Sequence, residues 1–151
     1  MQFFEDLELG KSGRFGKFEV TRDEVIAFAS KYDPQPFHLD DAAAALTHFG
    51  RLAASGWQTC AMTMAMIVAR HTESGHQGLG SPGVDELRFL RPVYPGDTLS
   101  YESEIIEKRR SKSRPEMGVF RSRTTTYNQH DEVVLSYTST AFVRVRQVSS
   151  L

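Results

Sequence analysis

The longest apolar stretch with helical character covers residues 57–72, and the only regular elements predicted after it are strands. Apolar side chains occur almost all round this stretch, so we expect a helix that is buried on most of its faces. Residues 71–82 are rich in glycine and predict a loop. β-Branched and aromatic residues, separated by turn signals, then predict four strands, over residues 84–90, 99–107, 118–127 and 133–145.

The first part of the chain adds one strand, one helix of about three turns and a short helix over residues 40–45, which has acidic residues in its first turn. Residues 13–20 alternate loosely between apolar and polar, as in a strand. Thr21 and Glu24 form a capping box, in which the Thr21 hydroxyl accepts a hydrogen bond from the Glu24 N–H. The helix that follows should end near Tyr32, because Asp33 precedes a proline. The predicted fold class is therefore α+β, with a mostly antiparallel sheet wrapped around one long apolar helix.

Composition limits the class of protein. The chain has 151 residues, which suits a single domain over residues 1–151 with a core of its own. Its net charge of −1 lacks the basic excess of nucleic-acid-binding proteins. The single cysteine, Cys60, excludes an internal disulfide and a cysteine-based zinc site. With no signal-peptide pattern and no apolar stretch that could cross a bilayer, we expect a cytoplasmic protein.

The segment from Asp33 to His38 combines two titratable side chains with two prolines, Pro34 and Pro36. Prolines fix φ and favour extended geometry in the preceding residue, so this segment should be a stiff, bent loop. Taken singly, Asp33 suits a turn that ends a helix, and His38 suits an ordinary loop. Together they suggest an acid/base pair, because rigid placement of proton-handling groups is useful in an enzyme.

Ser55 and Gly56 stand at the start of the long helix. The first N–H groups of a helix have no partner within it, and the helix dipole favours negative charge there. Glycine allows a ligand to approach that backbone closely, so Gly56 is a candidate oxyanion donor. Ser55 is a candidate N-cap, and the two interpretations are compatible.

Three separated motifs occur in a recognisable order. They are Asp33-x-x-Pro36-x-His38 followed by an alanine-rich turn, Ser55-Gly56-Trp57 at the start of the apolar helix, and Gly83-Val84-Asp85-Glu86-Leu87-Arg88-Phe89 with Arg91-Pro92-Val93 and Pro95-Gly96-Asp97. Together, over about residues 5–145, they resemble the MaoC-like dehydratases, whose members include the (R)-specific enoyl-CoA hydratases.

This resemblance implies a hot-dog fold, a curled antiparallel sheet around a central helix. It also implies a homodimer, or a dimer of such dimers, with acyl-CoA thioester sites near the subunit interface. Asp33 and His38 match the catalytic pair of the family, and Gly56 matches the glycine whose N–H faces the thioester carbonyl. The remaining candidate contacts to substrate are Gln35, Ser55 and Trp57. The CoA thioester is the substrate, and we expect neither a cofactor nor a membrane or nucleic-acid partner.

Some positions depart from the family pattern. Gln35 stands where an asparagine is common, and Ser55 stands where a histidine is frequent. A serine often found further into the helix has no clear counterpart, and Ala61 lies nearest to its place. These differences bear on the choice of substrate more than on the type of reaction.

Hydration of a 2-enoyl thioester requires a base for water, an acid for Cα and a group that stabilises the enolate-like oxygen. We expect Asp33 to activate the water, and His38 to orient it and share in proton delivery, since imidazole generally titrates near neutral pH. Either residue could donate the proton to Cα. Gly56 would supply the oxyanion contact.

Two other functions compete with hydration. Many hot-dog thioesterases carry a carboxylate on the central helix, but residues 56–72 contain none, and the first is Glu73. A binding or assembly subunit would keep the fold without turnover, and the intact Asp33/His38 pair argues against that.

Three further patterns carry less weight. The basic run over residues 108–114 fits a solvated turn better than a CoA phosphate contact. Asp33, His38 and Asp40 are metal-ligand types, but no other histidine has a matching spacing, so we expect no metal site. The methionines between residues 62 and 66 are expected to line the core and the acyl pocket.

Overall fold

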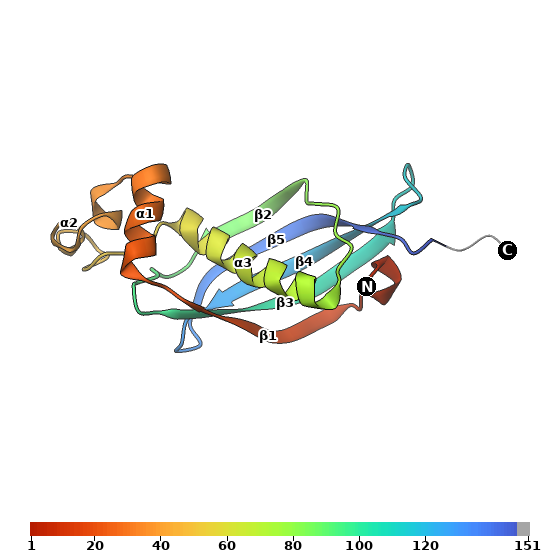
Figure 1. Cartoon of the computed structure of the whole chain (residues 1–151), viewed down its shortest axis with the longest axis horizontal. Coiled ribbons are helices and arrows are strands. Elements are labelled where there is room, and N and C mark those ends of the chain that lie inside the picture. Colours follow the sequence, from red (N-terminus) through yellow and green to blue (C-terminus); the bar gives the residue numbers. More distant parts are fainter. Residues whose placement is uncertain (148–151) are drawn as a thin grey trace.

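In the computed structural model, which describes residues 1–147, one antiparallel sheet packs against one long helix (Figure 1). Residues 148–151 of the predicted domain lie outside the described part. The elements, with η for 3-10 helices, are η1 (Phe4–Asp6), β1 (Gly10–Glu19), α1 (Arg22–Tyr32), η2 (Pro36–His38), α2 (Asp41–Ala45), α3 (Gly56–Ser74), β2 (Gly83–Phe89), β3 (Thr98–Arg110), β4 (Met117–Tyr127) and β5 (Val133–Arg144).

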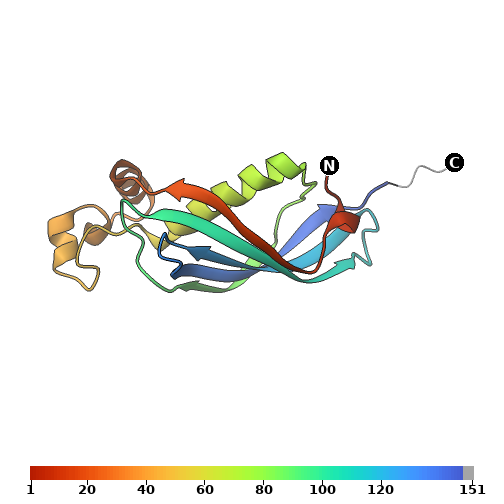
Figure 2. The same cartoon turned by 90° about the horizontal axis from the view of Figure 1, so that it is seen from below.

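The sheet has five strands in the order β1-β3-β4-β5-β2, and all neighbouring strands are antiparallel. Strand β2 pairs with β5 rather than with β3, so β1 and β2 form the two edges. The strands curve, and α3 lies against one face of the sheet (Figure 2). This arrangement confirms the predicted α+β layout of a curled sheet and a central helix.

The core lies between α3 and the sheet. Met62 and Met66 of α3 are 3% and 6% exposed, and they belong to one cluster with buried side chains of β3 and β5. The fully buried hydroxyls of Thr63, on α3, and Thr126, on β4, lie 2.8 Å apart and form a hydrogen bond. Apolar burial holds α3 against the sheet, and the threonine pair ties one point of the helix to one strand.

The prediction that α3 is buried on most of its faces is wrong for the chain by itself. Trp57, Met64 and Val68 are between 49% and 59% exposed, and they lie on the side of α3 that the sheet does not cover. A helix on a single sheet buries one stripe, because the sheet contacts only one side. Met64 is therefore not part of the core, in contrast to Met62 and Met66.

The helix boundaries follow local signals. Thr21 caps α1 and accepts a hydrogen bond from the Glu24 N–H at 3.3 Å, as predicted. The predicted stiff loop contains one turn of 3-10 helix, because Pro36 at the first position already has the φ that such a turn needs. The loop predicted from residue 71 begins only at Gly75, which ends α3 with a left-handed φ of 65°.

The basic run lies at the β3–β4 hairpin, at the opposite end of the molecule from α1 and α2 (Figure 1). Part of it holds the N-terminal segment, since the Lys108 ammonium donates to the carbonyl of Leu7 at 2.5 Å and Arg110 pairs with Glu5 at 3.1 Å. No helix within residues 1–147 combines the length and hydropathy that a membrane crossing requires.

The buried threonine pair allows a test of how α3 is held. Thr63→Val should lower the free energy of unfolding by about 1–3 kcal/mol, because it leaves the Thr126 hydroxyl buried without its partner. Urea denaturation measures this loss. The double variant Thr63→Val/Thr126→Val should be more stable than the sum of the two single losses predicts. Strictly additive losses would show that the two hydroxyls do not interact.

Candidate active site

The loop after α1 carries the two predicted catalytic side chains. Its backbone is held by hydrogen bonds from the Asp33 N–H to Ala29 O and from the His38 N–H to Gln35 O, both at 2.9 Å. The Ala53 N–H also donates to Phe37 O at 3.3 Å, which ties the loop to the segment that precedes α3. The stiff loop and the start of the long helix therefore lie next to each other.

The structure brings the Asp33 carboxylate and the His38 imidazole together, with 3.5 Å between Asp33 Oδ2 and His38 Nε2. His38 is 5% exposed, and its Nδ1 lies 2.6 Å from Ala53 O. A carbonyl oxygen can only accept, so Nδ1 carries a hydrogen, and in the neutral form of the ring Nε2 carries a lone pair. In that form the ring presents an acceptor towards the side on which Asp33 lies.

Two donors hold the Asp33 carboxylate. Gln35 Nε2 donates to Oδ1 and Ser55 Oγ donates to Oδ2, each at 2.7 Å. Burial of the carboxyl raises its pKa, but these two hydrogen bonds, together with the positive charge that His38 carries when protonated, outweigh burial and hold the pKa of Asp33 below its ordinary value. Asp33 is therefore an ionised carboxylate at neutral pH.

The start of α3 leaves one backbone donor free. The Gln58 and Thr59 N–H groups donate to Ser55 O, and the Trp57 N–H donates to Ser55 Oγ at 3.3 Å. Within the described residues, the Gly56 N–H donates to no protein acceptor. This free N–H stands at the positive end of a 19-residue helix, where negative charge is stabilised.

These groups line an open groove with a volume of about 490 Å³. Its polar lining comes from Asp33, Gln35, His38, His48 and Arg91, and its apolar lining includes Phe49, Ala54, Trp57, Phe89, Leu90 and Val93. Of the six predicted site residues, five line the groove; Ser55 is the sixth and lies buried behind Asp33.

Sequence reasoning assigned no role to His48, Phe49 or Phe89, although all three line the groove. Phe89 belongs to the third motif, but nothing in that motif shows that its ring packs 5.9 Å from the Trp57 ring. His48 and Phe49 follow α2 and carry no local signal of a site.

No group of three or more potential metal ligands occurs among residues 1–147. Asp40, the third residue considered for a metal, instead caps α2 by accepting from the Ala43 N–H at 3.0 Å. In this groove the Asp33/His38 pair therefore stands beside the free N–H of Gly56.

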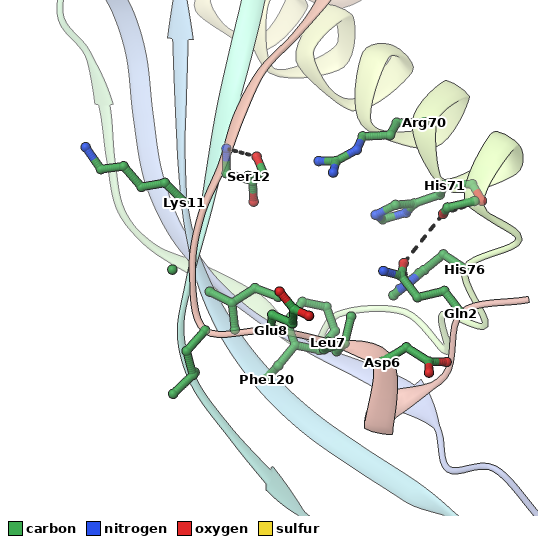
Figure 3. A pocket seen from close by; sticks show the side chains of 15 residues that line it. Gln2, Asp6, Leu7, Glu8, Lys11, Ser12, Arg70, His71, His76 and Phe120 are labelled. Atoms are coloured by element: carbon green, nitrogen blue, oxygen red, sulfur yellow. Dashed lines mark hydrogen bonds between the residues drawn. The ribbon is translucent and has the colours of Figure 1, made fainter.

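A second pocket lies towards the other end of α3 (Figure 3). Its rings of His71 and His76 stack 4.2 Å apart, and His76 Nδ1 lies 3.2 Å from the side-chain oxygen of Gln2. Burial, with the nearby His76 and Arg70, lowers the pKa of His71 to about 4, so this ring is neutral at neutral pH. His76 therefore helps to hold the N-terminal segment in place. The backbone of Gln2 also forms hydrogen bonds with the backbones of Gly75 and Gln77.

Comparison with known protein families decides the class to which this arrangement belongs. The family model described as a MaoC-like domain matches residues 8–128. The chain belongs to the MaoC-like domain family.

Two curated relatives share most of the length. The 3-hydroxybutyryl-CoA dehydratase of Methylorubrum extorquens is 31% identical over 138 residues, which are 88% of this chain and 78% of that protein. The (R)-specific enoyl-CoA hydratase of Aeromonas caviae is 32% identical over 109 residues, 72% of this chain and 78% of that protein.

Solved structures agree with the fold. A MaoC-like dehydratase from Rhodospirillum rubrum is 37% identical, covers 98% of this chain and 100% of its own, and superimposes with a TM-score of 0.84. The predicted family and the predicted hot-dog fold are thereby confirmed.

The close contact of Phe89 with the start of α3 can be tested with Gly56→Ala. A methyl group at position 56 would lie 2.8 Å from the Phe89 ring, which is half exposed and free to swing away. The melting temperature should therefore change little, while the environment of Trp57, the only tryptophan, should change. Trp57 fluorescence emission measures this.

Phe89→Ala is the matched control for that experiment. By itself it should alter Trp57 emission, because it removes the neighbouring ring. Adding Gly56→Ala to Phe89→Ala should then have little further effect. An emission spectrum that is the same in Gly56→Ala and in the original protein would contradict the described packing.

Proposed function

We propose that this protein is a hydro-lyase that adds water to, or removes it from, the 2,3 double bond of an enoyl-CoA-type thioester. The observation that supports this most directly is one groove that holds an ionised Asp33, a buried His38 and the free N–H of Gly56. The relatives described as a dehydratase and a hydratase of CoA thioesters support the same reaction type. We propose that the CoA thioester is the substrate and that the reaction uses no cofactor.

The water would bind beside the acid/base pair. When His38 is neutral, its Nε2 and the Asp33 carboxylate are both acceptors, so one water within reach of both can donate a hydrogen to each. Such a water presents its oxygen lone pair to Cβ of the enoyl group. As the C–O bond forms, one member of the pair takes a proton from the water, and the pair delivers a proton to Cα. The double bond is thus replaced by one C–O and one C–H bond.

The negative charge that develops on the thioester oxygen needs a donor that is already in place. The Gly56 N–H is such a donor, and the dipole of α3 adds to it. The Phe89 ring packs against the backbone of Gly56 in the space that a side chain would occupy. The aromatic and aliphatic lining of the groove suits the acyl part of the substrate.

Thioester hydrolysis is the second candidate, and the position of the carboxylates argues against it. The only acidic residue of α3 is Glu73, at the end of the helix remote from Gly56. Release of free CoA thiol from saturated thioesters would favour this candidate over hydration. A non-catalytic thioester-binding subunit is the third candidate, and turnover of any enoyl thioester would exclude it.

We also infer that the exposed face of α3 is covered by a second copy of the chain, in a homodimer or a dimer of such dimers. Trp57, Met64 and Val68 form an apolar stripe on α3, and Val84 and Phe89 of the edge strand β2 are also half exposed. The Trp57–Phe89 contact makes the two surfaces continuous. Apolar patches of this kind mark protein interfaces.

Asp33→Asn tests the catalytic proposal. The change keeps the size of the side chain but removes its charge, so hydration of crotonyl-CoA should fall by at least about 100-fold. Loss of the ultraviolet absorbance of the conjugated thioester measures the rate. The melting temperature should stay nearly unchanged, because the amide oxygen can still accept from Gln35 and the Ser55 hydroxyl can accept from the amide NH2 group.

Asp23→Asn, a change of the same kind on the exposed first turn of α1, should leave the rate unchanged and serves as the control. A large drop in melting temperature for Asp33→Asn would instead indicate a structural role. Failure of the original protein to hydrate any short, medium or branched enoyl-CoA would count against the hydro-lyase proposal as a whole.

The oligomer is tested with Met64→Lys/Val68→Lys. Two ammonium groups on the apolar stripe cannot be buried without partners, so a dimer should dissociate to the mass of a single chain. Light scattering coupled to size exclusion measures the mass. Leu46→Lys, at an apolar position that is 90% exposed beside α2, should leave the mass unchanged. A monomeric original protein would refute the inference.

A further inference from the structure

Ser55 forms hydrogen bonds with both segments that make up the site, the loop after α1 and the first turn of α3. Its side chain is fully buried, its hydroxyl donates to Asp33 Oδ2 at 2.7 Å, and the same oxygen accepts from the Trp57 N–H at 3.3 Å. The residue is therefore bonded both to the carboxylate on the loop and to the first turn of α3. It lies behind the carboxylate and does not line the groove.

The two donors on Asp33 differ in a way that separates their roles. Gln35 is exposed and bonds Oδ1, the oxygen that does not face His38. Ser55 is buried and bonds Oδ2, the oxygen that lies 3.5 Å from His38 Nε2. Of these two, only Ser55 restrains the carboxylate oxygen next to the imidazole.

We propose that Ser55 is a positioning residue, whose hydroxyl fixes Asp33 Oδ2 relative to both His38 and the Gly56 N–H. The proposal rests on the proposed function, because it assigns Ser55 a part in that reaction. The serine acts through Asp33 and through the first turn of α3. Its two hydrogen bonds keep the Asp33 carboxylate and the Gly56 N–H in fixed relative positions when substrate binds.

The hydrogen bond also has an electrostatic consequence. A donor to the carboxylate stabilises its ionised form, so removing the Ser55 hydroxyl should raise the pKa of Asp33. The titratable or charged groups around the carboxylate are His38, and His48 and Arg91 across the groove. Within the described residues Ser55 forms no hydrogen bond with any of these three, so we assign a shift in the titration of Asp33 to the lost hydroxyl.

Two substitutions separate positioning from simple helix capping. Ser55→Ala removes the hydroxyl and is a poor N-cap, whereas Ser55→Gly removes the hydroxyl but caps a helix nearly as well as serine. If Ser55 positions Asp33, both variants should lose about 10- to 100-fold in kcat/KM, mainly in kcat. In both, the acid side of the pH profile should move to higher pH by about one unit.

If Ser55 only caps α3, Ser55→Gly should match the original protein in kcat/KM and in its pH profile, which would overturn the proposal. Ser55→Thr keeps a hydroxyl and should restore the position of the acid side even where the extra methyl group lowers the melting temperature. Thr21→Ala, which removes the corresponding cap from α1, should lower stability without moving the profile.

A measurement that does not need turnover keeps this proposal separate from the proposed function. The carboxyl carbon of Asp33, followed by ¹³C NMR from pH 7 downwards, should titrate about one pH unit higher in Ser55→Ala and Ser55→Gly. Unchanged titration in both variants would overturn the positioning role, whether or not the protein is active. A shifted titration in a protein that hydrates no enoyl thioester would refute the proposed reaction but leave the Ser55–Asp33 coupling standing.

Discussion

The burial of one face of α3 against the sheet is the constraint on which the rest of the structure depends. Met62 and Met66 fill the core, and the Thr63–Thr126 hydrogen bond fixes the helix to β4. A helix is stiff over this length, so anchoring its middle also fixes its first turn. That first turn presents the Gly56 N–H, and the core thus determines where the proposed oxyanion donor lies without contributing a side chain to the groove.

The site forms where this first turn meets the loop after α1. Neither segment has a catalytic arrangement by itself, since the loop supplies a carboxylate and an imidazole and the helix supplies a backbone donor. Ser55 is bonded to both and is shielded from solvent, which makes its hydrogen bonds less open to competition from water. In the second pocket, the stacked rings of His71 and His76 contact the N-terminal segment through the bond between His76 and Gln2.

The apolar character of α3 has two separate causes. One face packs on the sheet, and the opposite face carries exposed apolar side chains that continue onto the edge strand β2. In the sequence, apolar residues occur on both faces of α3, and this pattern predicts a helix that is surrounded by protein. Within one chain the sheet covers one face of α3, and we infer that a second copy of the chain covers the opposite face in the homodimer.

Local signals in the sequence were enough to predict most of the elements and to single out the residues of the candidate site. The Thr21 cap, the prolines at positions 34 and 36, and the Ser55-Gly56 helix start act within a few residues, so they could be interpreted without the fold. Only the tertiary structure placed the Ser55 hydroxyl on Asp33, set the Phe89 ring over Gly56 and left one face of α3 open. These contacts join residues far apart in the chain, and their geometry arises only when the helix packs on the curled sheet.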